Sequence, residues 1–287
     1  MNKNVELVTD ALSIVAESPV WDQHNKLLYY VDIQGKRLRK LDWNNAKISD
    51  LVIPQQIGCI ALDANGDIVG GLEDGVYRID KNGSLKIINK PFNMEGIRFN
   101  DGKAGPDGMF YLGTMSREGK ASLYRMDYEG GMHKLLGEIG NSNGLDWDTQ
   151  RNLFYFNDTP TMKTDVFDFN MQNGNISNRR TAYKYQNMGS PDGMAIDIEG
   201  KLWTALWGGG RIVRVDPQTG SILETVIIPV ENVASCVFAG EDLRDLIITT
   251  SSHFTDLGRQ PLAGSVFKIR TDVPGKQMYR LFQRRNY

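Results

Sequence analysis

Three residues with oxygen-bearing side chains occupy the same position of a repeated segment. Glu17, Asn143 and Asp192 each stand at the start of a short apolar stretch. Two carboxylates and an amide carbonyl that converge on one point form an oxygen-rich site of low formal charge, which suits a hard divalent cation. Because three protein ligands leave positions for water or substrate, such an ion can polarise a carbonyl and acidify bound water. The residue types therefore favour hydrolysis of an ester or lactone, although Asp and Asn are also common turn residues at strand starts.

The segment that carries these residues recurs along the whole chain. The six copies begin at Glu17, Gly58, Gly96, Asn143, Asp192 and Ser235. Their starts are 41, 38, 47, 49 and 43 residues apart, a period typical of β-propeller blades rather than of helical repeats. Most copies continue through a polar turn into a second apolar run, such as 27–32 or 153–158. Each copy therefore predicts a β-hairpin.

Further strands are expected to extend each hairpin outward. Alternating apolar and polar residues occupy 76–80, 123–127, 166–170, 212–216 and 266–270. These runs predict the third strands of blades, and the runs after them predict the fourth. The sequence thus predicts an all-β protein, a six-bladed β-propeller with four-stranded blades, in which the six starting residues surround one mouth of the central channel. One arrangement pairs residues 5–8 with the last blade, which leaves no open edge between first and last blades, whereas residues 278–282 lie outside the complete units.

Blade three adds a positively charged residue. Gly96, Arg98 and Asn100 share one face of the predicted inner strand, because side chains alternate between faces, and this face carries the first position of the repeat. An arginine that points into the channel is costly unless it is paired or binds a ligand. Arg98 and Asn100 are therefore candidates for holding hydroxyl and carbonyl oxygens of a substrate. The alternative is an ion pair of Arg98 inside the protein, with Asp101, Asp158 or Asp32.

Other catalytic chemistries have less support. Of the three histidines, His24 is placed in a turn, His133 on an outer strand and His253 beyond the second strand of blade six. The absence of a Gly-x-Ser-x-Gly segment argues against a Ser-His-Asp triad. Cys59 and Cys236 hold matching positions in blades two and six and are interpreted as free buried thiols. A disulfide between them is the alternative.

The composition limits the class of partner. The 287 residues carry a net charge of −2 and are 40% hydrophobic, and no linker divides them, so we expect one domain over 1–287. No basic patch for nucleic acid is indicated. The first ten residues lack the apolar region of a signal peptide, and no stretch reaches the roughly 18 apolar residues of a membrane span. We expect a cytoplasmic protein without nucleic-acid or membrane contact, with no obligate protein partner and with a small molecule as its ligand.

Several motifs follow one another in a fixed order. They are Glu17-Ser-Pro-Val-Trp21, Arg98-Phe-Asn-Asp-Gly-Lys103, Gly113-Thr-Met115, Ser142-Asn-Gly-Leu-Asp-Trp147, Pro191-Asp-Gly-Met194 and Gly200-Lys-Leu-Trp203. Together they resemble the motifs of the regucalcin and gluconolactonase family, also called the senescence marker protein family, over nearly the whole chain. The resemblance implies a six-bladed propeller with one divalent metal bound by Glu17, Asn143 and Asp192. It also implies that Asp192 is the acid/base residue, that Arg98 and Asn100 bind a sugar lactone, and that Glu118, after the Gly-Thr-Met motif, contacts it.

These observations lead to one expected activity. We expect a metal-dependent hydrolase that opens a small sugar lactone, such as an aldono-1,5-lactone, to its acid. Calcium is the favoured metal, and zinc, manganese and magnesium are compatible with the ligands. Two alternatives stay open, a lactonase or esterase of other or broader range and a non-catalytic calcium-binding protein. Asn157 and Asp158 are expected to add polar walls to the channel mouth, with Trp207 as its one large apolar wall.

Overall fold

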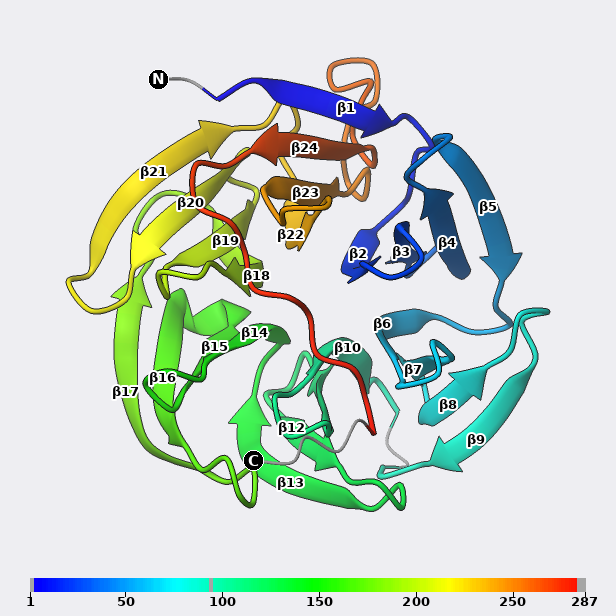
Figure 1. Cartoon of the computed structure of the whole chain (residues 1–287), viewed down its shortest axis with the longest axis vertical. Coiled ribbons are helices and arrows are strands. Elements are labelled where there is room, and N and C mark those ends of the chain that lie inside the picture. Colours follow the sequence, from blue (N-terminus) through cyan, green and yellow to red (C-terminus); the bar gives the residue numbers. More distant parts are fainter. Residues whose placement is uncertain (1–2, 93–94, 283–287) are drawn as a thin grey trace.

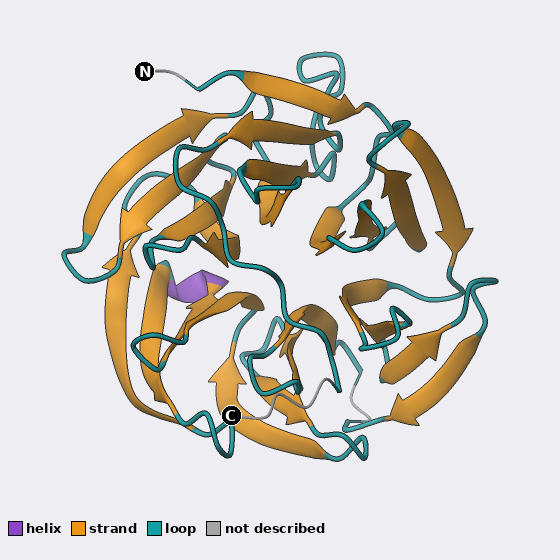
Figure 2. Cartoon of the chain, in the orientation of Figure 1, coloured by secondary structure: helices purple, strands orange, loops and turns teal. Residues whose placement is uncertain are grey.

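Six four-stranded antiparallel sheets surround a common axis in the computed structural model of the protein (Figure 1). The structure describes residues 3–92 and 95–282. Within them the only helical segment is one 3₁₀ turn, η1 (Thr159–Thr161), shown in purple in Figure 2. The predicted all-β architecture, a six-bladed propeller with four-stranded blades, is confirmed.

The first three blades follow one another along the chain. Blade one consists of β2 (Ala16–Asp22), β3 (Leu27–Asp32), β4 (Arg37–Asp42) and β5 (Lys47–Val52). Blade two consists of β6 (Ile57–Leu62), β7 (Ile68–Leu72), β8 (Val76–Ile79) and β9 (Leu85–Asn89). Blade three consists of β10 (Arg98–Ala104), β11 (Phe110–Met115), β12 (Ala121–Met126) and β13 (Met132–Ile139).

The remaining blades complete the ring. Blade four consists of β14 (Ser142–Asp148), β15 (Leu153–Asp158), β16 (Lys163–Phe169) and β17 (Ile176–Lys184). Blade five consists of β18 (Ser190–Ile196), β19 (Leu202–Trp207), β20 (Arg211–Asp216) and β21 (Ser221–Ile227). Blade six consists of β22 (Val233–Ala239), β23 (Asp245–Thr250), β24 (Val266–Arg270) and β1 (Val5–Thr9).

The last blade joins the two ends of the chain. β1 pairs antiparallel with β24, with Val5 opposite Ile269 and Leu7 opposite Phe267. The predicted pairing of the N-terminal strand with the last blade is therefore confirmed. Because the outermost strand of blade six comes from the start of the chain, hydrogen bonds close the ring between its first and last blades.

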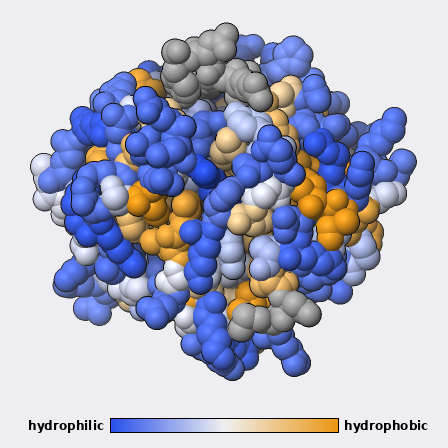
Figure 3. All heavy atoms as spheres, turned by 90° about the horizontal axis from the view of Figure 1, so that it is seen from below, coloured by the Kyte–Doolittle hydropathy of each residue, from blue (hydrophilic) through white to orange (hydrophobic). Residues whose placement is uncertain are grey.

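Burial falls from the axis to the rim of each blade. Every residue of β2, β6 and β22 is buried, whereas β5 and β17 at the rim are mostly exposed. Inner strands are covered on both faces, so they are rich in apolar residues, and outer strands have a face in water. The edge of the ring in Figure 3 is accordingly mostly hydrophilic, with small hydrophobic patches.

The hydrophobic core lies between blades rather than at the axis. One cluster joins Trp203 and Ile212 of blade five to Phe238 and Phe267 of blade six. Another joins Tyr111 of blade three to residues of blade four. Similar clusters fill the other interfaces between neighbouring blades. Since each blade packs on two neighbours, the positions of the six inner strands around the axis are tightly fixed.

All six inner strands carry a pairing irregularity at the same place. It lies between Glu17 and Val20 in β2, and the corresponding shifts fall at 57–59, 99–102, 142–145, 191–194 and 233–235. A β-bulge turns side chains away from the regular alternation. Because these bulges sit where the inner strands begin, they aim the first residues of the repeat at one end of the axis, which we call the front end.

Blade three departs from the sequence prediction at this position. Gly96 lies before β10, in the connection from blade two, with a φ of 75°. The bulge of β10 instead contains Asn100 and Asp101. Asn100 is therefore the blade-three residue that corresponds to Asn143 and Asp192, and the placement of Gly96 in the repeat was wrong. The long connection between β9 and β10 shifted the apparent start of the repeat.

The opposite, back end of the axis is crossed by the C-terminal segment 271–282, which we call the strap (Figure 1). The strap forms hydrogen bonds with residues at the ends of inner strands: Leu281 N–H donates to Leu62 O at 2.8 Å, and Ile198 N–H donates to Pro274 O at 3.0 Å. Arg280 Nη2 donates to the buried Asp22 carboxylate at 2.6 Å. As predicted, residues 278–282 belong to no blade. The strap covers the back end, so ligands of the inner-strand bulges approach from the front.

Candidate functional site

Two buried carboxyl groups lie close together at the front end. Glu17 and Asp192 are both 6% exposed and come from the bulged starts of β2 and β18. Burial raises the pKa of Glu17 to about 8, helped by the charge of Asp101 and opposed by the Ser18 N–H and Arg98. Burial also raises the pKa of Asp192 well above its usual value, and the negative charges of Glu17 and Asp101 add to this. The two carboxyls therefore repel one another in a dry environment.

A chain of hydrogen bonds joins Asn143 to blade three. Asn100 Nδ2 donates to Asn143 Oδ1 and to Ser142 O, both at 2.9 Å. Arg98 Nη1 donates to Asn100 Oδ1 at 2.9 Å and to Phe99 O at 2.7 Å. Arg98 forms no ion pair with Asp101, Asp158 or Asp32, which argues against that alternative. The guanidinium is instead linked to the Asn143 amide through Asn100.

Close approach of the inner strands sets the spacing of these groups. A Cβ atom on Gly144 would lie 2.5 Å from the Asp192 carbonyl oxygen. Asn143 Nδ2 donates to Thr159 Oγ1 at 2.6 Å, and Thr159 Oγ1 donates to Pro191 O at 2.8 Å. Thr159 belongs to η1, so this helical turn connects Asn143 to the backbone beside Asp192. Only glycine at 144 permits β14 and β18 to bring the two side chains so near.

Asp101 is a buried carboxyl that the sequence analysis did not assign to the site. It follows Asn100 in the bulge of β10, and its Oδ1 accepts from the Gly102 N–H at 2.7 Å. Burial raises its pKa to about 6, while the Lys103 ammonium lowers it. Lys103 is itself held by Asp146 at 2.8 Å and by Met194 O at 2.9 Å. The Asn-Asp pair in the motif was the available signal, because a bulge can turn two successive side chains toward the axis.

The donor set fits a divalent cation. Within the described residues the Asp192 carboxyl has no hydrogen-bond or ion-pair partner, and every neighbouring charge that acts on it is negative. A buried carboxylate without a partner is costly, and a cation between it and Glu17 would remove the repulsion. No group of three His, Cys, Asp or Glu side chains in the described ranges could hold a metal. A site here therefore depends on the Asn143 amide as its third oxygen ligand.

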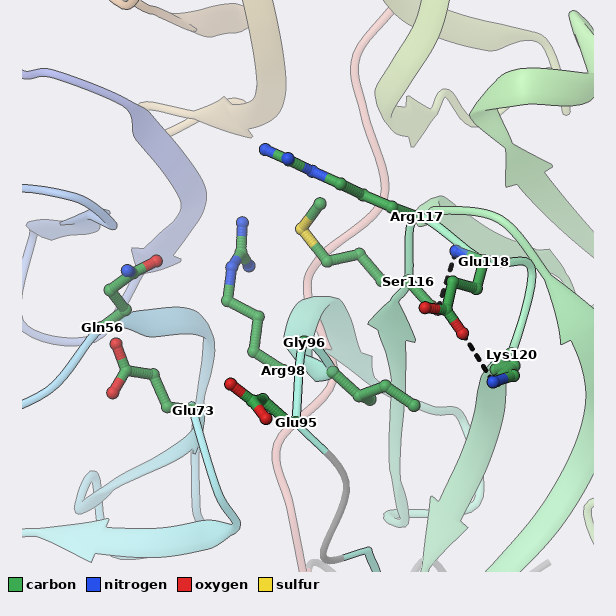
Figure 4. Close-up of a pocket in the computed structure, with 11 residues that line it drawn as sticks. Gln56, Glu73, Glu95, Gly96, Arg98, Ser116, Arg117, Glu118 and Lys120 are labelled. Atoms are coloured by element: carbon green, nitrogen blue, oxygen red, sulfur yellow. Dashed lines mark hydrogen bonds and ion pairs between the residues drawn. The ribbon is translucent and has the colours of Figure 1, made fainter.

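Glu118 lies farther from the axis than the other candidates. It lines a pocket of about 560 Å³ that also contains Arg98. Its carboxylate pairs with Lys120 at 2.5 Å, its side chain is 71% exposed, and Figure 4 shows it turned away from Arg98. The structure thus brings Glu17, Asn100, Asn143 and Asp192 together, joins Arg98 to them, and places Glu118 on the rim of the neighbouring pocket.

Three other expected wall residues have different surroundings. Asn157 is fully buried, and its Nδ2 donates to Asp192 O at 2.7 Å, so it holds the backbone of the site rather than lining it. Asp158 accepts the N–H groups of Gly140 and Asn141 in a turn. Asn157 and Asp158 were expected to add polar walls to the channel mouth, but both are buried and their side chains form hydrogen bonds with backbone groups. Trp207 is half-buried at the end of β19.

The remaining residues considered for chemistry are structural in character. Cys59 and Cys236 are free, buried thiols, as predicted, and burial raises the pKa of both. His133 pairs with Asp127 at 2.7 Å on the surface. No helix in the described part of the chain has the length and apolar character needed to cross a membrane.

Comparison with known proteins identifies relatives over nearly the whole chain. The family model of the SMP-30/gluconolactonase/LRE-like region matches residues 15–252. A Bacillus subtilis (strain 168) protein, YvrE, whose name proposes a sugar lactone lactonase, is 37% identical over 280 residues, 94% of this chain and 96% of the relative. Regucalcin of Danio rerio is 38% identical over 280 residues, 92% of this chain and 93% of its own.

Solved structures share the fold. A luciferin-regenerating enzyme superposes with a TM-score of 0.92 at 27% identity, over 98% of this chain and 99% of that one. A calcium-binding protein, regucalcin, from Agrobacterium tumefaciens also gives 0.92, over 99% and 98% of the two chains, but at 22% identity this likeness concerns the fold alone. The family model spans most of the sequence, and curated relatives above 30% identity match it nearly end to end. The chain therefore belongs to the SMP-30/gluconolactonase/LRE-like family.

Proposed function

We propose that the protein is a divalent-metal-dependent hydrolase that opens a small sugar lactone, of the aldono-1,5-lactone type, to its acid. The observation that carries the proposal is the pair of buried carboxyls, Glu17 and Asp192, beside the Asn143 amide and within reach of the Arg98 charge. The name of one relative supports the reaction class, since the Bacillus subtilis protein is named as a proposed sugar lactone lactonase.

Each residue has an assigned task in this proposal. Glu17, Asn143 and Asp192 hold the ion, with calcium favoured and zinc, manganese or magnesium compatible. When bound, the ion supplies Lewis-acid polarisation of the lactone carbonyl and acidification of water. The Asp192 carboxylate accepts a proton from the attacking water and returns it to the ring oxygen as the ester bond breaks. Without a bound ion, its buried setting favours the protonated form, and a cation beside it would favour the carboxylate form that can accept a proton.

Residues of blade three orient the substrate in this proposal. The Arg98 guanidinium and the Asn100 amide bind ring oxygens, and they are already aligned by their mutual hydrogen bond. The Glu118 carboxylate forms an ion pair with Lys120, and this pair must break before Glu118 contacts the substrate. That contact is also part of the proposal. The proposed unit is the single domain 1–287. The cytoplasm is the proposed location, which the two free thiols support, since disulfide-poor proteins suit reducing compartments.

Acid release from glucono-1,5-lactone tests the function. The protein is treated with a chelator and dialysed, and proton release above the spontaneous rate is recorded with and without added calcium, zinc, manganese or magnesium. We expect activity in at least one metal, little activity without metal, and a kcat lowered by about 10²–10⁴-fold in Asp192→Asn. A non-catalytic calcium-binding protein would bind the ion but release no acid above background, and activity on unhydroxylated lactones at equal efficiency would indicate a lactonase of broader range.

A further inference from the structure

The pocket beside Arg98 has one wall in blade two that no step above uses. Gln56 precedes β6, and Glu73 lies in the turn between β7 and β8. Both residues line the pocket, and in Figure 4 they lie on one side of Arg98 while the 116–120 loop lies on the other. Blades two and three therefore form the pocket together, and Arg98 links it to the candidate metal ligands through Asn100.

Hydrogen bonds fix the backbone of Glu73, but its carboxylate has no partner among the described residues. Its backbone N–H donates to Gln55 Oε1 at 3.1 Å, and Leu72 N–H donates to Gly75 O at 2.8 Å across the same tight turn. The Glu73 residue is half-buried. Within the part of the chain that the structure describes, neither the Glu73 carboxylate nor the Gln56 amide has a hydrogen-bond or ion-pair partner, and no dashed line reaches either in Figure 4. A half-buried carboxylate left open in a pocket is available to a ligand.

Arg98 lies between two carboxylates that it does not touch. Burial lowers the pKa of Arg98 to about 10, and the charges of Glu17 and then Glu73 oppose this effect. The guanidinium forms no ion pair within 4.0 Å with either, and among the described residues only its Nη1 donates hydrogen bonds to protein groups. The space between Arg98 and Glu73 therefore suits a group that accepts a hydrogen bond from the guanidinium and donates one to the carboxylate. A hydroxyl group does both.

A charged substrate group fits this space poorly. A phosphate or carboxylate would be attracted by Arg98 but repelled by Glu73. An ammonium group would be attracted by Glu73 but repelled by Arg98. The pocket lining as a whole has as many carboxylates as cations: Glu73, Glu95 and Glu118 against Arg98, Arg117 and Lys120. The lining therefore carries no net positive charge that would attract an anion.

We infer that Glu73 is a specificity-determining residue that selects neutral sugar lactones, because it binds a substrate hydroxyl together with Arg98 and repels substrates that carry a phosphate or carboxylate. This inference rests on the proposed lactonase function and concerns the part of the substrate remote from the lactone carbonyl. Gln56 adds a second polar group on the same wall.

The test compares glucono-1,5-lactone with its 6-phosphate in the metal-loaded enzyme. For the wild type we expect a kcat/KM at least about 100-fold higher on the neutral lactone. Glu73→Gln keeps the shape of the side chain and removes its charge. The kcat/KM for the neutral lactone should therefore fall about tenfold, mainly because KM rises, whereas the kcat/KM for the phosphorylated lactone should increase. Glu73→Lys should raise kcat/KM on the phosphorylated lactone by a further tenfold or more. The matched control is Glu231→Gln, which changes an exposed glutamate between β21 and β22. It should leave kcat/KM unchanged for both substrates.

A binding measurement keeps this test separate from the activity itself. Calorimetry with 1,5-anhydroglucitol and its 6-phosphate, which lack the lactone carbonyl, should show the same preference and the same reversal in Glu73→Lys. A wild type that hydrolyses no lactone but keeps this binding preference would refute the proposed function and leave the role of Glu73 standing. Equal selectivity of wild type and Glu73→Gln, in hydrolysis or in binding, would overturn the role of Glu73.

Discussion

Asn100 and Asn143, from neighbouring blades, are joined by a 2.9 Å hydrogen bond between Nδ2 of the former and Oδ1 of the latter. The same Asn100 side chain accepts from Arg98, so one residue connects a proposed substrate group to a proposed metal ligand. The bond also turns the oxygen of the Asn143 amide toward blade three while its nitrogen is held by Thr159. Under the proposed function, Asn100 therefore couples the orientation of a metal ligand to the binding of substrate.

Loss of Asn100 should affect both properties. In Asn100→Ala, the Asn143 amide loses the donor that orients it, and Arg98 loses an acceptor. We expect metal affinity to weaken about tenfold and KM for gluconolactone to rise by a similar factor, as for the loss of a buried hydrogen bond. Calorimetric metal titration and steady-state kinetics measure the two effects. A variant in which only KM changes would show that Asn100 does not position the metal ligand.

Substitutions of the site residues should fall in a definite order. Asp192→Asn removes the proton acceptor but keeps an oxygen ligand, so kcat should fall by about 10²–10⁴-fold. Arg98→Ala should mainly raise KM, because Arg98 is assigned to substrate binding. Cys236→Ser changes a buried thiol that donates a hydrogen bond to Trp203 O, and it should leave kcat near normal. Retention of activity within about tenfold of wild type in Asp192→Asn, a loss of only about 1.4 kcal/mol, would contradict the acid/base role.

The strap should contribute to stability through Arg280. Its guanidinium pairs with Asp22, whose side chain is 1% exposed, and Arg280→Met leaves this carboxylate with the backbone N–H groups of His24 and Asn25 and the Asn25 side-chain amide as its donors. We expect the free energy of unfolding to fall by about 1–3 kcal/mol in urea titrations. Arg259→Met, in which an 87% exposed arginine is changed, is the control and should cost less than about 1 kcal/mol. Equal stability of the two variants would show that the strap does not secure the back end.

Asp148, also at the back end, predicts a pH dependence of stability. Burial acts to raise its pKa, but the hydrogen bond from Arg151 and the charges of Lys276 and Arg151 outweigh it and hold the pKa below its usual value. Because the folded state binds this proton less tightly than the unfolded state, the carboxylate stabilises the fold above about pH 3.9 and loses this contribution as the pH falls through the lower folded pKa.

The matching experiment uses Asp148→Asn. The variant should be less stable than wild type at pH 7, with a difference that shrinks as the pH falls below 4, as measured by urea unfolding at a series of pH values. Asp256→Asn, an exposed aspartate, serves as the control. A difference that stays constant down to pH 3 would mean that packing, not charge, explains the loss.

The repeat pattern predicted the fold because apolar inner strands and alternating third strands recur with blade spacing. It also brought Glu17, Asn143 and Asp192 to the bulged starts of inner strands, although Glu17 directly precedes its bulge whereas Asn143 and Asp192 lie inside theirs. Gly96 was misplaced because a bulge and a long connection change the count of residues in ways that periodicity does not register. Glu73 was missed for a different reason. It sits in a turn of blade two, and only the closed ring brings it opposite Arg98.

The most direct test of the central claim is a single calcium titration of the chelator-treated protein in which bound ion and acid release from gluconolactone are measured in the same sample. The account predicts that activity rises in proportion to occupancy and saturates at one ion per chain. It also predicts that Glu17→Gln shifts both curves together, whereas Asp192→Asn lowers acid release even where the ion site is filled. Full activity in the metal-free protein, or saturation of the ion site without any acid release above background, would contradict it.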